Sequence, residues 1–188
     1  MSRLLIINGS PRENGLTAKI SQMTAERVKK FGYETEIISL KDLKISDCKA
    51  CMSCKTTGKC AIDDDMTQMY EKIRSSDMLI LASPVYFGAE TGTMRTFIDR
   101  FYAMVNSRDG ERIVNFGNVK KGSVLLTCGA IDGYMTYGGV LSRITKTMMS
   151  MGVKDMSGSI ICGIGPEDAE SSEKVSDYID SIKYQLEM

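Results

Sequence analysis

Short apolar runs recur along the chain without polar alternation, and segments of helical period separate them. The run Met78-Leu79-Ile80-Leu81-Ala82 is typical, because it offers no polar side chain to a solvated sheet face. A strand that is apolar on both sides must be covered on both faces, as in parallel sheets between helices. The pattern therefore predicts an α/β fold of successive βαβ units.

The expected elements alternate regularly along the chain. Strands are predicted over residues 4–8, 34–40, 78–83, 123–127 and 159–163. Apolar residues at helical spacing predict helices near 16–31, 66–73, 91–105, 139–151 and 175–186. Since no linker, repeat or low-complexity tract interrupts them, we expect a single domain over residues 1–188.

Charge and hydropathy limit the classes of partner and the compartment that we expect for this chain. The 24 basic residues balance the 24 acidic ones, which argues against a nucleic-acid or anionic-membrane surface and favours small molecules or proteins as partners. No apolar run approaches the ~20 residues that span a bilayer, and residues 4–7 are too short for a secretory signal. We therefore expect a cytoplasmic protein with reduced thiols.

The loop after the first predicted strand has the composition of an anion cradle. Its hydroxyl, amide and guanidinium groups, together with the free N–H groups of the next helix, would converge on a phosphate. The residues are Ser10, Arg12, Asn14, Gly15, Leu16 and Thr17. Neither a Walker A motif nor G-x-G-x-x-G is present, and an ordinary capped loop stays open as the alternative.

Two further loops follow predicted strands. The first is Ser83, Pro84, Val85, Tyr86, Phe87 and Gly88, where proline stiffens the backbone and the aromatic pair offers a surface to a flat ring. The second is Thr127, Cys128, Gly129 and Ala130. An aromatic pair after a strand is by itself more often core, and Cys128 and Cys162, each alone in sequence, are expected to be packing residues.

Four cysteines crowd one polar loop at residues 48–60. The spacing is Cys48-x2-Cys51-x2-Cys54-x5-Cys60, in a chain with no histidine. Thiolates bind soft metals, so both zinc and an iron–sulfur cluster are open, although the spacing favours iron. The loop follows the second strand, which predicts that it lies at the carboxyl edge of the sheet. Asp63, Asp64 and Asp65 follow, and Asp64 or Asp65 is expected to cap the next helix.

These motifs together resemble the NAD(P)H-dependent FMN reductase group of the flavodoxin-like superfamily. Ser-Pro-Arg-x-Asn-Gly-x-Thr resembles its FMN phosphate loop, Ser-Pro-Val-Tyr-Phe-Gly the segment beside its flavin ring, and Phe97-Ile98-Asp99-Arg100 a recurring helical stretch. The resemblance implies a flavodoxin-like doubly wound five-stranded parallel sheet in a three-layer α/β/α arrangement. It also implies non-covalent FMN bound by the three loops, with the flavin rather than a side chain carrying the chemistry.

Within this group the cysteine quartet resembles that of the iron–sulfur flavoproteins, which implies a [4Fe–4S] cluster near the FMN. The expected function is electron transfer from ferredoxin or NAD(P)H to an acceptor such as a quinone, in a homo-oligomer, either a dimer or a tetramer. The alternatives are an NAD(P)H:FMN or quinone reductase without a cluster, a flavodoxin-like carrier without turnover, and a zinc-stabilised binding protein. Residues 102–118 are interpreted as too polar for core, forming either a contact arm or a mobile lid.

Overall fold

A parallel sheet forms the centre of the molecule. The computed structural model describes residues 2–108 and 111–187. The strands β1 (Arg3–Asn8), β2 (Glu34–Ser39), β3 (Met78–Tyr86), β7 (Lys121–Cys128) and β8 (Asp155–Cys162) lie in the order β2-β1-β3-β7-β8, and each neighbouring pair is parallel. Counting only these strands, the order is that of the flavodoxin-like fold. The predicted fold class is confirmed.

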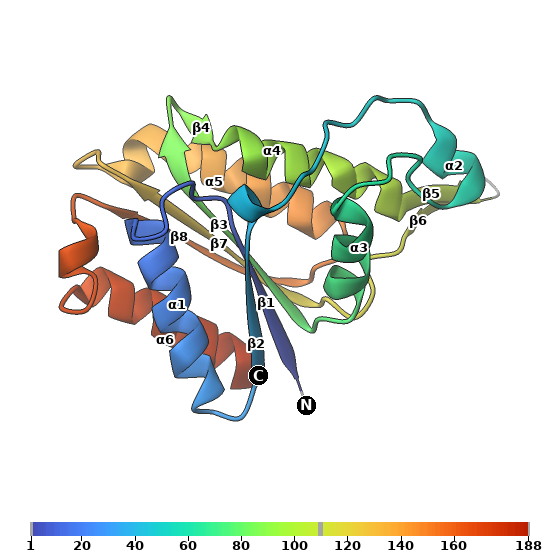
Figure 1. The fold of residues 1–188 in the computed structure, drawn as a ribbon. Coiled ribbons are helices and arrows are strands. Elements are labelled where there is room, and N and C mark those ends of the chain that lie inside the picture. The colour runs from blue at the N-terminus through green and yellow to red at the C-terminus, as the bar shows by residue number, and fades with distance from the viewer. Residues whose placement is uncertain (1, 109–110, 188) are drawn as a thin grey trace.

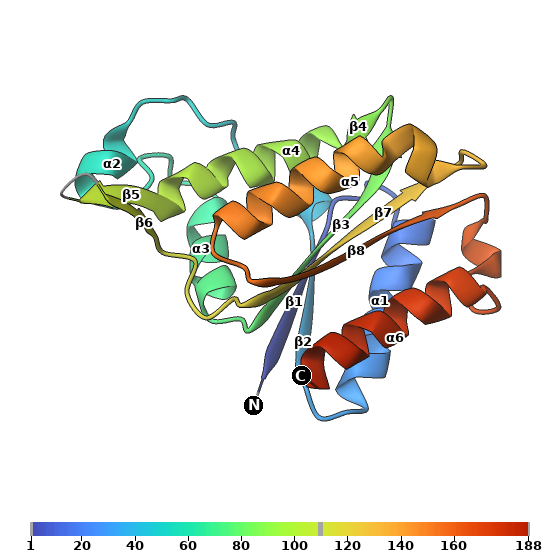
Figure 2. The same ribbon diagram turned by 180° about the vertical axis from the view of Figure 1, so that it is seen from behind.

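Helices cover both faces of this sheet (Figure 1). One face carries α1 (Leu16–Lys29) and α6 (Glu173–Glu187), and the other carries α3 (Met66–Arg74), α4 (Gly92–Asp99) and α5 (Gly133–Ser150). The view from behind shows the same separation into layers (Figure 2). Each face therefore has its own hydrophobic core.

The apolar run in β3 serves both cores. Leu79 and Leu81 pack with α3, α4 and α5, while Met78, Ile80 and Ala82 pack with α1 and α6. All five are essentially inaccessible to solvent. Burial on both faces explains why this strand lacks alternating polar residues.

Several boundaries differ from those predicted. The strand expected to end at 83 continues to Tyr86 and turns back through β4 (Ala89–Glu90), so part of the predicted third-strand loop is a β-hairpin. The helix expected from 139 begins at Gly133, because the Asp132 side chain accepts a hydrogen bond from Met135 N–H at 3.1 Å. These caps and turns carry no apolar periodicity, so the pattern could not locate them.

The segment 102–118 contains an antiparallel hairpin of β5 (Val105–Arg108) and β6 (Glu111–Val114). It follows α4 and the 3₁₀ turn η2 (Arg100–Met104), which together occupy the helix predicted over 91–105. The interpretation as too polar for core is wrong for Met104 and Phe116, which are both buried. Asp109 and Gly110 lie outside the described residues.

The cysteine loop takes a path that its sequence position did not predict. It leaves the carboxyl edge at the 3₁₀ turn η1 (Leu40–Asp42), crosses the outer side of α4, and reaches α2 (Ser53–Thr57) beyond the far end of that helix (Figures 1 and 2). A hydrogen bond of 2.6 Å from Thr96 Oγ1 to Asp47 Oδ1 fixes the crossing. The predicted position of the quartet at the carboxyl edge is therefore wrong. None of the helices that the structure describes is both long and apolar enough to cross a bilayer.

Candidate functional site

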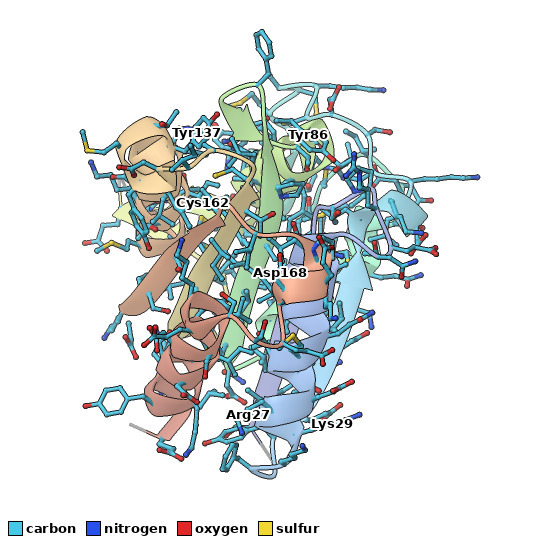
Figure 3. The ribbon with its side chains drawn as sticks, turned by 90° about the vertical axis from the view of Figure 1, so that its left-hand side faces the viewer. Arg27, Lys29, Tyr86, Tyr137, Cys162 and Asp168 are labelled. Carbon is cyan, nitrogen blue, oxygen red and sulfur yellow. The ribbon has the colours of Figure 1, made fainter. Side chains whose placement is uncertain are left out.

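A cleft of about 280 Å³ opens at the carboxyl ends of the parallel strands. It collects segments that are far apart in sequence, namely the loops after β1, β3, β7 and β8. Its lining comprises Ser10, Arg12, Asn14, Gly15, Leu16, Thr17, Pro84, Val85, Tyr86, Thr127, Cys128, Gly129, Ile164 and Pro166. Figure 3 looks toward this end of the sheet and shows Tyr86 on β3, Cys162 on β8 and Asp168 on the turn η3 (Pro166–Asp168).

The first loop is preorganised by its own hydrogen bonds. Asn8 Oδ1 accepts from Ser10 N–H at 3.0 Å, and Ser10 Oγ accepts from Arg12 N–H at 3.2 Å. The chain enters α1 at Gly15, where no described side chain caps the helix. The first N–H groups of α1 thus lack a capping partner and can bind an anion, which the macrodipole also favours.

Gly15 keeps this loop tight. A β-carbon at Gly15 would lie 3.1 Å from Arg12 Cβ, tighter than most such contacts, and would touch Ser10 Oγ at 3.4 Å. Arg12 brings positive charge to the lining, and none of the described lining residues is acidic. The chemistry of this end of the cleft suits a phosphate.

The middle segment reaches the cleft through only part of its predicted residues. Pro84, Val85 and Tyr86 line it, and the Tyr86 side chain is half-exposed. Phe87, predicted to face a planar ligand, points into solvent at φ 50°, beside Gly88 at the hairpin turn. Neither Phe87 nor Gly88 lines the cleft.

Ser83 is connected to this site through hydrogen bonds. It is buried, and its Oγ accepts a hydrogen bond from Thr91 N–H at 3.1 Å. Thr91 Oγ1 in turn donates to the Gly9 carbonyl oxygen at 2.9 Å. This chain of contacts connects the hairpin to the first loop, so Ser83 positions the cleft without lining it.

The third segment contributes Thr127, Cys128 and Gly129, while Ala130 lies outside the lining. A buried hydrogen bond of 2.7 Å joins Thr127 Oγ1 to Thr17 Oγ1 and holds β7 against α1. Burial raises the pKa of the Cys128 thiol, and the neighbouring Cys162 adds to that rise, although a backbone hydrogen bond at Ala130 opposes it. The Cys128 thiol is thereby held in its neutral form near pH 7.

The four cysteines line one small hollow near the carboxyl end of α4. Cys48, Cys51, Cys54 and Cys60 line it together with Arg100 and Tyr102. Ala50 and Met52 adopt positive φ values of 51° and 60°, which curl the loop around the hollow. Among the described residues, no three Cys, Asp or Glu side chains approach one another closely enough to hold a metal ion.

Arg100 forms the base of this hollow. Its side chain is only 1% exposed, and its Nη1 and Nη2 donate to Asp64 Oδ2 and Oδ1 at 2.7 and 3.0 Å. Nη1 also donates to Ser46 O at 2.7 Å, and Nη2 to Cys60 Sγ at 3.4 Å. One residue thus connects both ends of the cysteine loop to η2.

Asp64 performs two tasks. Its Oδ1 accepts from Met66 N–H, the first N–H of α3, at 3.1 Å, whereas the N-cap residue Asp65 makes no capping hydrogen bond with its side chain. Burial by itself would raise the pKa of Asp64, but the hydrogen bonds from Arg100 and Ser46 and the Arg100 charge lower it below its usual value. The carboxylate stays ionised beside a buried cation.

Comparison with known proteins decides the family. A model of the family described as NADPH-dependent FMN reductase matches residues 2–132. The chain belongs to this family.

Curated relatives and solved structures agree with that assignment. An iron–sulfur flavoprotein of Archaeoglobus fulgidus is 43% identical over 98 residues, which are 52% of this chain and 48% of that protein. A second one from the same organism is 29% identical over 187 residues, covering 96% of this chain and 81% of its own length. The first relatives are thus matched over about half of their length.

The fold is shared more widely than the sequence. An NAD(P)H:quinone oxidoreductase from Methanothermobacter marburgensis superposes with a TM-score of 0.74 at 15% identity, covering 96% of this chain and 94% of that one. At this identity the likeness shows the flavodoxin-like architecture alone.

For this FMN reductase family member, sequence reasoning missed part of the cleft. Ile164 and Pro166, after β8, close its outer side. They carry no motif, but β8 is the last parallel strand, and its carboxyl end lies at the same edge as the other loops. The rule that ligands bind at the carboxyl ends of parallel strands could therefore have indicated these two residues from the sequence.

Reasoning from sequence also missed Glu90, a buried carboxylate behind the hairpin. Its oxygens accept from Arg143 Nη1 and Nη2 at 2.9 and 2.5 Å and from Arg95 at 3.3 Å. Burial alone would raise the pKa of Glu90, yet the Arg143 hydrogen bonds and the two positive charges bring it below its usual value. The ion pairs attach β4 to α4 and α5 and so hold Tyr86 in place.

Proposed function

We propose that this protein is an FMN-dependent oxidoreductase that binds FMN in the cleft at the carboxyl edge of the sheet. The observation that supports this most is the uncapped start of α1, beside Arg12 and opposite the exposed face of Tyr86. The start of α1 offers a phosphate site, and Tyr86 offers a surface for a flat ring. When bound, FMN would supply the redox chemistry, with NAD(P)H as the proposed electron donor.

In this proposal each group of the cleft has a physical task. Arg12 and the α1 N–H groups neutralise the phosphate charge, while Thr17, through Thr127, sets the distance between the phosphate loop and β7. Apolar groups at Val85 and Ile164 exclude water from the ring. The hairpin end, fixed by Glu90, presents the ring of Tyr86.

The test is FMN titration of the Gly15→Ala variant by flavin fluorescence. The added methyl would crowd Arg12 and Ser10, and we expect FMN affinity to fall about tenfold, equivalent to about 1.4 kcal/mol. Gly92→Ala is the matched control, since nothing lies within 4 Å of a β-carbon there. Equal affinity in both variants, or a protein that takes up no FMN, would refute this site.

We also propose that Cys48, Cys51, Cys54 and Cys60 bind a [4Fe–4S] cluster. All four thiols line one hollow, and thiolates are the ligands that a soft metal centre prefers, so closure of the loop around a cluster would bring them together. The matched curated relatives are named iron–sulfur flavoproteins. Arg100 supports the fit, because its buried Nε has no acceptor among the described residues, and an anionic group bound in the hollow could provide one. Hydrogen bonds and positive charge near thiolate ligands favour a reduced cluster.

The cluster would relay single electrons between the flavin and an acceptor such as a quinone, or from a donor such as ferredoxin. Within one chain the two sites lie at opposite ends of α4. Thr91, beside the cleft, and Arg100, at the hollow, are about 14 Å apart at 1.5 Å per residue. We expect a homo-oligomer, and the exposed apolar side chains of Phe87, Ile131 and Met135 are the surface offered to a second copy.

Anaerobic purification followed by iron and sulfide analysis and EPR of the reduced protein tests the cluster. About four irons per chain, lost in Cys54→Ser, is the expected result. Zinc without sulfide would instead identify a structural zinc site. An iron-free protein that still reduces quinones with NAD(P)H would be a cluster-free reductase, and FMN uptake without turnover would identify a carrier.

A further inference from the structure

Two cysteines outside the quartet, Cys128 and Cys162, end neighbouring strands at the cleft. β7 and β8 pair in parallel with Cys128 opposite Cys162. Partners in adjacent strands lie about 4.8 Å apart and point to the same face of the sheet. A disulfide requires α-carbons about 4.4–6.8 Å apart, so the backbone already satisfies this requirement.

The two side chains also lie against the same glycine. A methyl group built on Gly133 would lie 3.2 Å from both Cys128 Sγ and Cys162 Cβ, which places the two side chains on one side of that glycine. Gly133, having no side chain of its own, leaves room for the pair at the start of α5.

The two thiols differ in access and in partners. Cys128 lines the cleft, whereas Cys162 is 6% exposed. Cys162 Sγ accepts a hydrogen bond from Gly133 N–H at 3.4 Å, in the first turn of α5, and donates to Ile131 O at 3.4 Å. A backbone donor at a helix N-terminus favours negative charge on the sulfur that it contacts.

We propose that Cys128 and Cys162 form a two-electron dithiol/disulfide centre in the wall of the cleft, with a small disulfide as its oxidant. Cys128, as thiolate, attacks one sulfur of the small disulfide, and the other sulfur leaves as a thiolate that takes up a proton. Cys162 then attacks Cys128 Sγ, the new bond joins the two cysteines, and the second small thiolate leaves. In sum, the protein loses two protons and two electrons, and one small disulfide becomes two thiols.

Two features support this order of attack. Only Cys128 of the pair is accessible from the cleft, and the contacts of Cys162 hold its sulfur against β7. Since the pKa of Cys128 is raised, the first attack is slow near pH 7 and accelerates with rising pH. Neither step uses the flavin or the cluster, so this inference stands or falls independently of the proposed function.

The test is equilibration of the full chain in anaerobic glutathione redox buffers, with and without added FMN. The protein is then quenched with acid, alkylated, digested and mapped by mass spectrometry. We expect a peptide pair linked through Cys128 and Cys162, lighter by two hydrogen atoms and restored by dithiothreitol. Both thiols should be lost together, with no accumulation of a glutathione adduct.

Variants examine the sequence of steps. In Cys162→Ser the reaction should stop with glutathione on Cys128, and in Cys128→Ser the buried Cys162 should stay unmodified. If Cys128 and Cys162 of the wild-type chain are fully alkylated in both samples, or if Cys128 retains glutathione without forming the linkage, the proposal is overturned. The wild-type result decides this even if a variant fails to fold.

Discussion

Replacing Arg100 by methionine removes a buried cation while nearly preserving the length of the side chain. Arg100 is 1% exposed and its partner Asp64 is 8% exposed, so both charges depend on each other rather than on water. Breaking such a pair from one side costs about 3–5 kcal/mol. Asp64 keeps hydrogen bonds from Ser46 N–H at 2.9 Å and Met66 N–H at 3.1 Å. These donors place the expected loss of unfolding free energy near the lower end, at about 3 kcal/mol.

A loss of about 3 kcal/mol corresponds to a fall in Tm of about 6–12 °C, at about 2–4 °C per kcal/mol for a chain of this size. The effect depends on pH. Because the folded pKa of Asp64 is below its ordinary 3.8, the ionised pair stabilises the fold above that pH. This contribution is lost as the pH falls through the folded pKa, so wild type and variant should converge in acid.

Urea denaturation at pH 7 of Arg100→Met, Asp64→Asn and the double variant measures the coupling. The double variant leaves neither charge unpaired, and we expect its loss to be at least about 1 kcal/mol smaller than the sum of the single losses. Arg27→Met is the matched control. Arg27 pairs with Asp180 at 3.9 Å on the surface, and its removal should cost less than about 1 kcal/mol.

A mutually dependent Arg100–Asp64 pair is refuted if Arg100→Met lowers the free energy of unfolding no more than Arg27→Met does, or if the losses of the two single variants simply add. A second readout separates the charge from the packing. In protein carrying the proposed cluster, Arg100→Met should lower the midpoint potential in an EPR-monitored titration, since Arg100 Nη2 donates to Cys60 Sγ. An unchanged potential would show that Arg100 supports the loop only.

Two further predictions concern the frame of the cleft. Glu90→Gln should lower the free energy of unfolding by about 2 kcal/mol at pH 7, because Arg143 loses its ionised partner. The difference in stability from wild type should vanish as the pH falls well below the ordinary carboxyl pKa of 4.5. A difference that persists in acid contradicts the ion-pair account. Gly117→Ala should lower Tm far more than Gly152→Ala, since both glycines have positive φ but only the β-carbon at Gly117 would collide with the backbone, at 2.3 Å from Arg74 O.

The sequence predicted most of the architecture because strands and helices leave local signals. The apolar run of β3 required cover on both faces, and the stripe ending at Leu186 marked α6. The loop at Ser10 and Arg12 and the cysteine quartet were recognisable because their residues are consecutive or closely spaced. The extension of β3 to Tyr86 was not, since its hairpin depends on pairing with Ala89 rather than on hydropathy.

Other features depended on which segments meet in space. The path of the cysteine loop over α4 is fixed by contacts such as Thr96 with Asp47, and the pairing of Arg100 with Asp64 joins residues 36 positions apart. Cys128 has no neighbouring cysteine in the sequence, yet the order of β7 and β8 places Cys162 directly beside it. Local composition thus determined the fold class and indicated the kinds of ligand that the loops could bind. Long-range strand order and loop paths decided which side chains share a site, because residue spacing along a chain does not encode those distances.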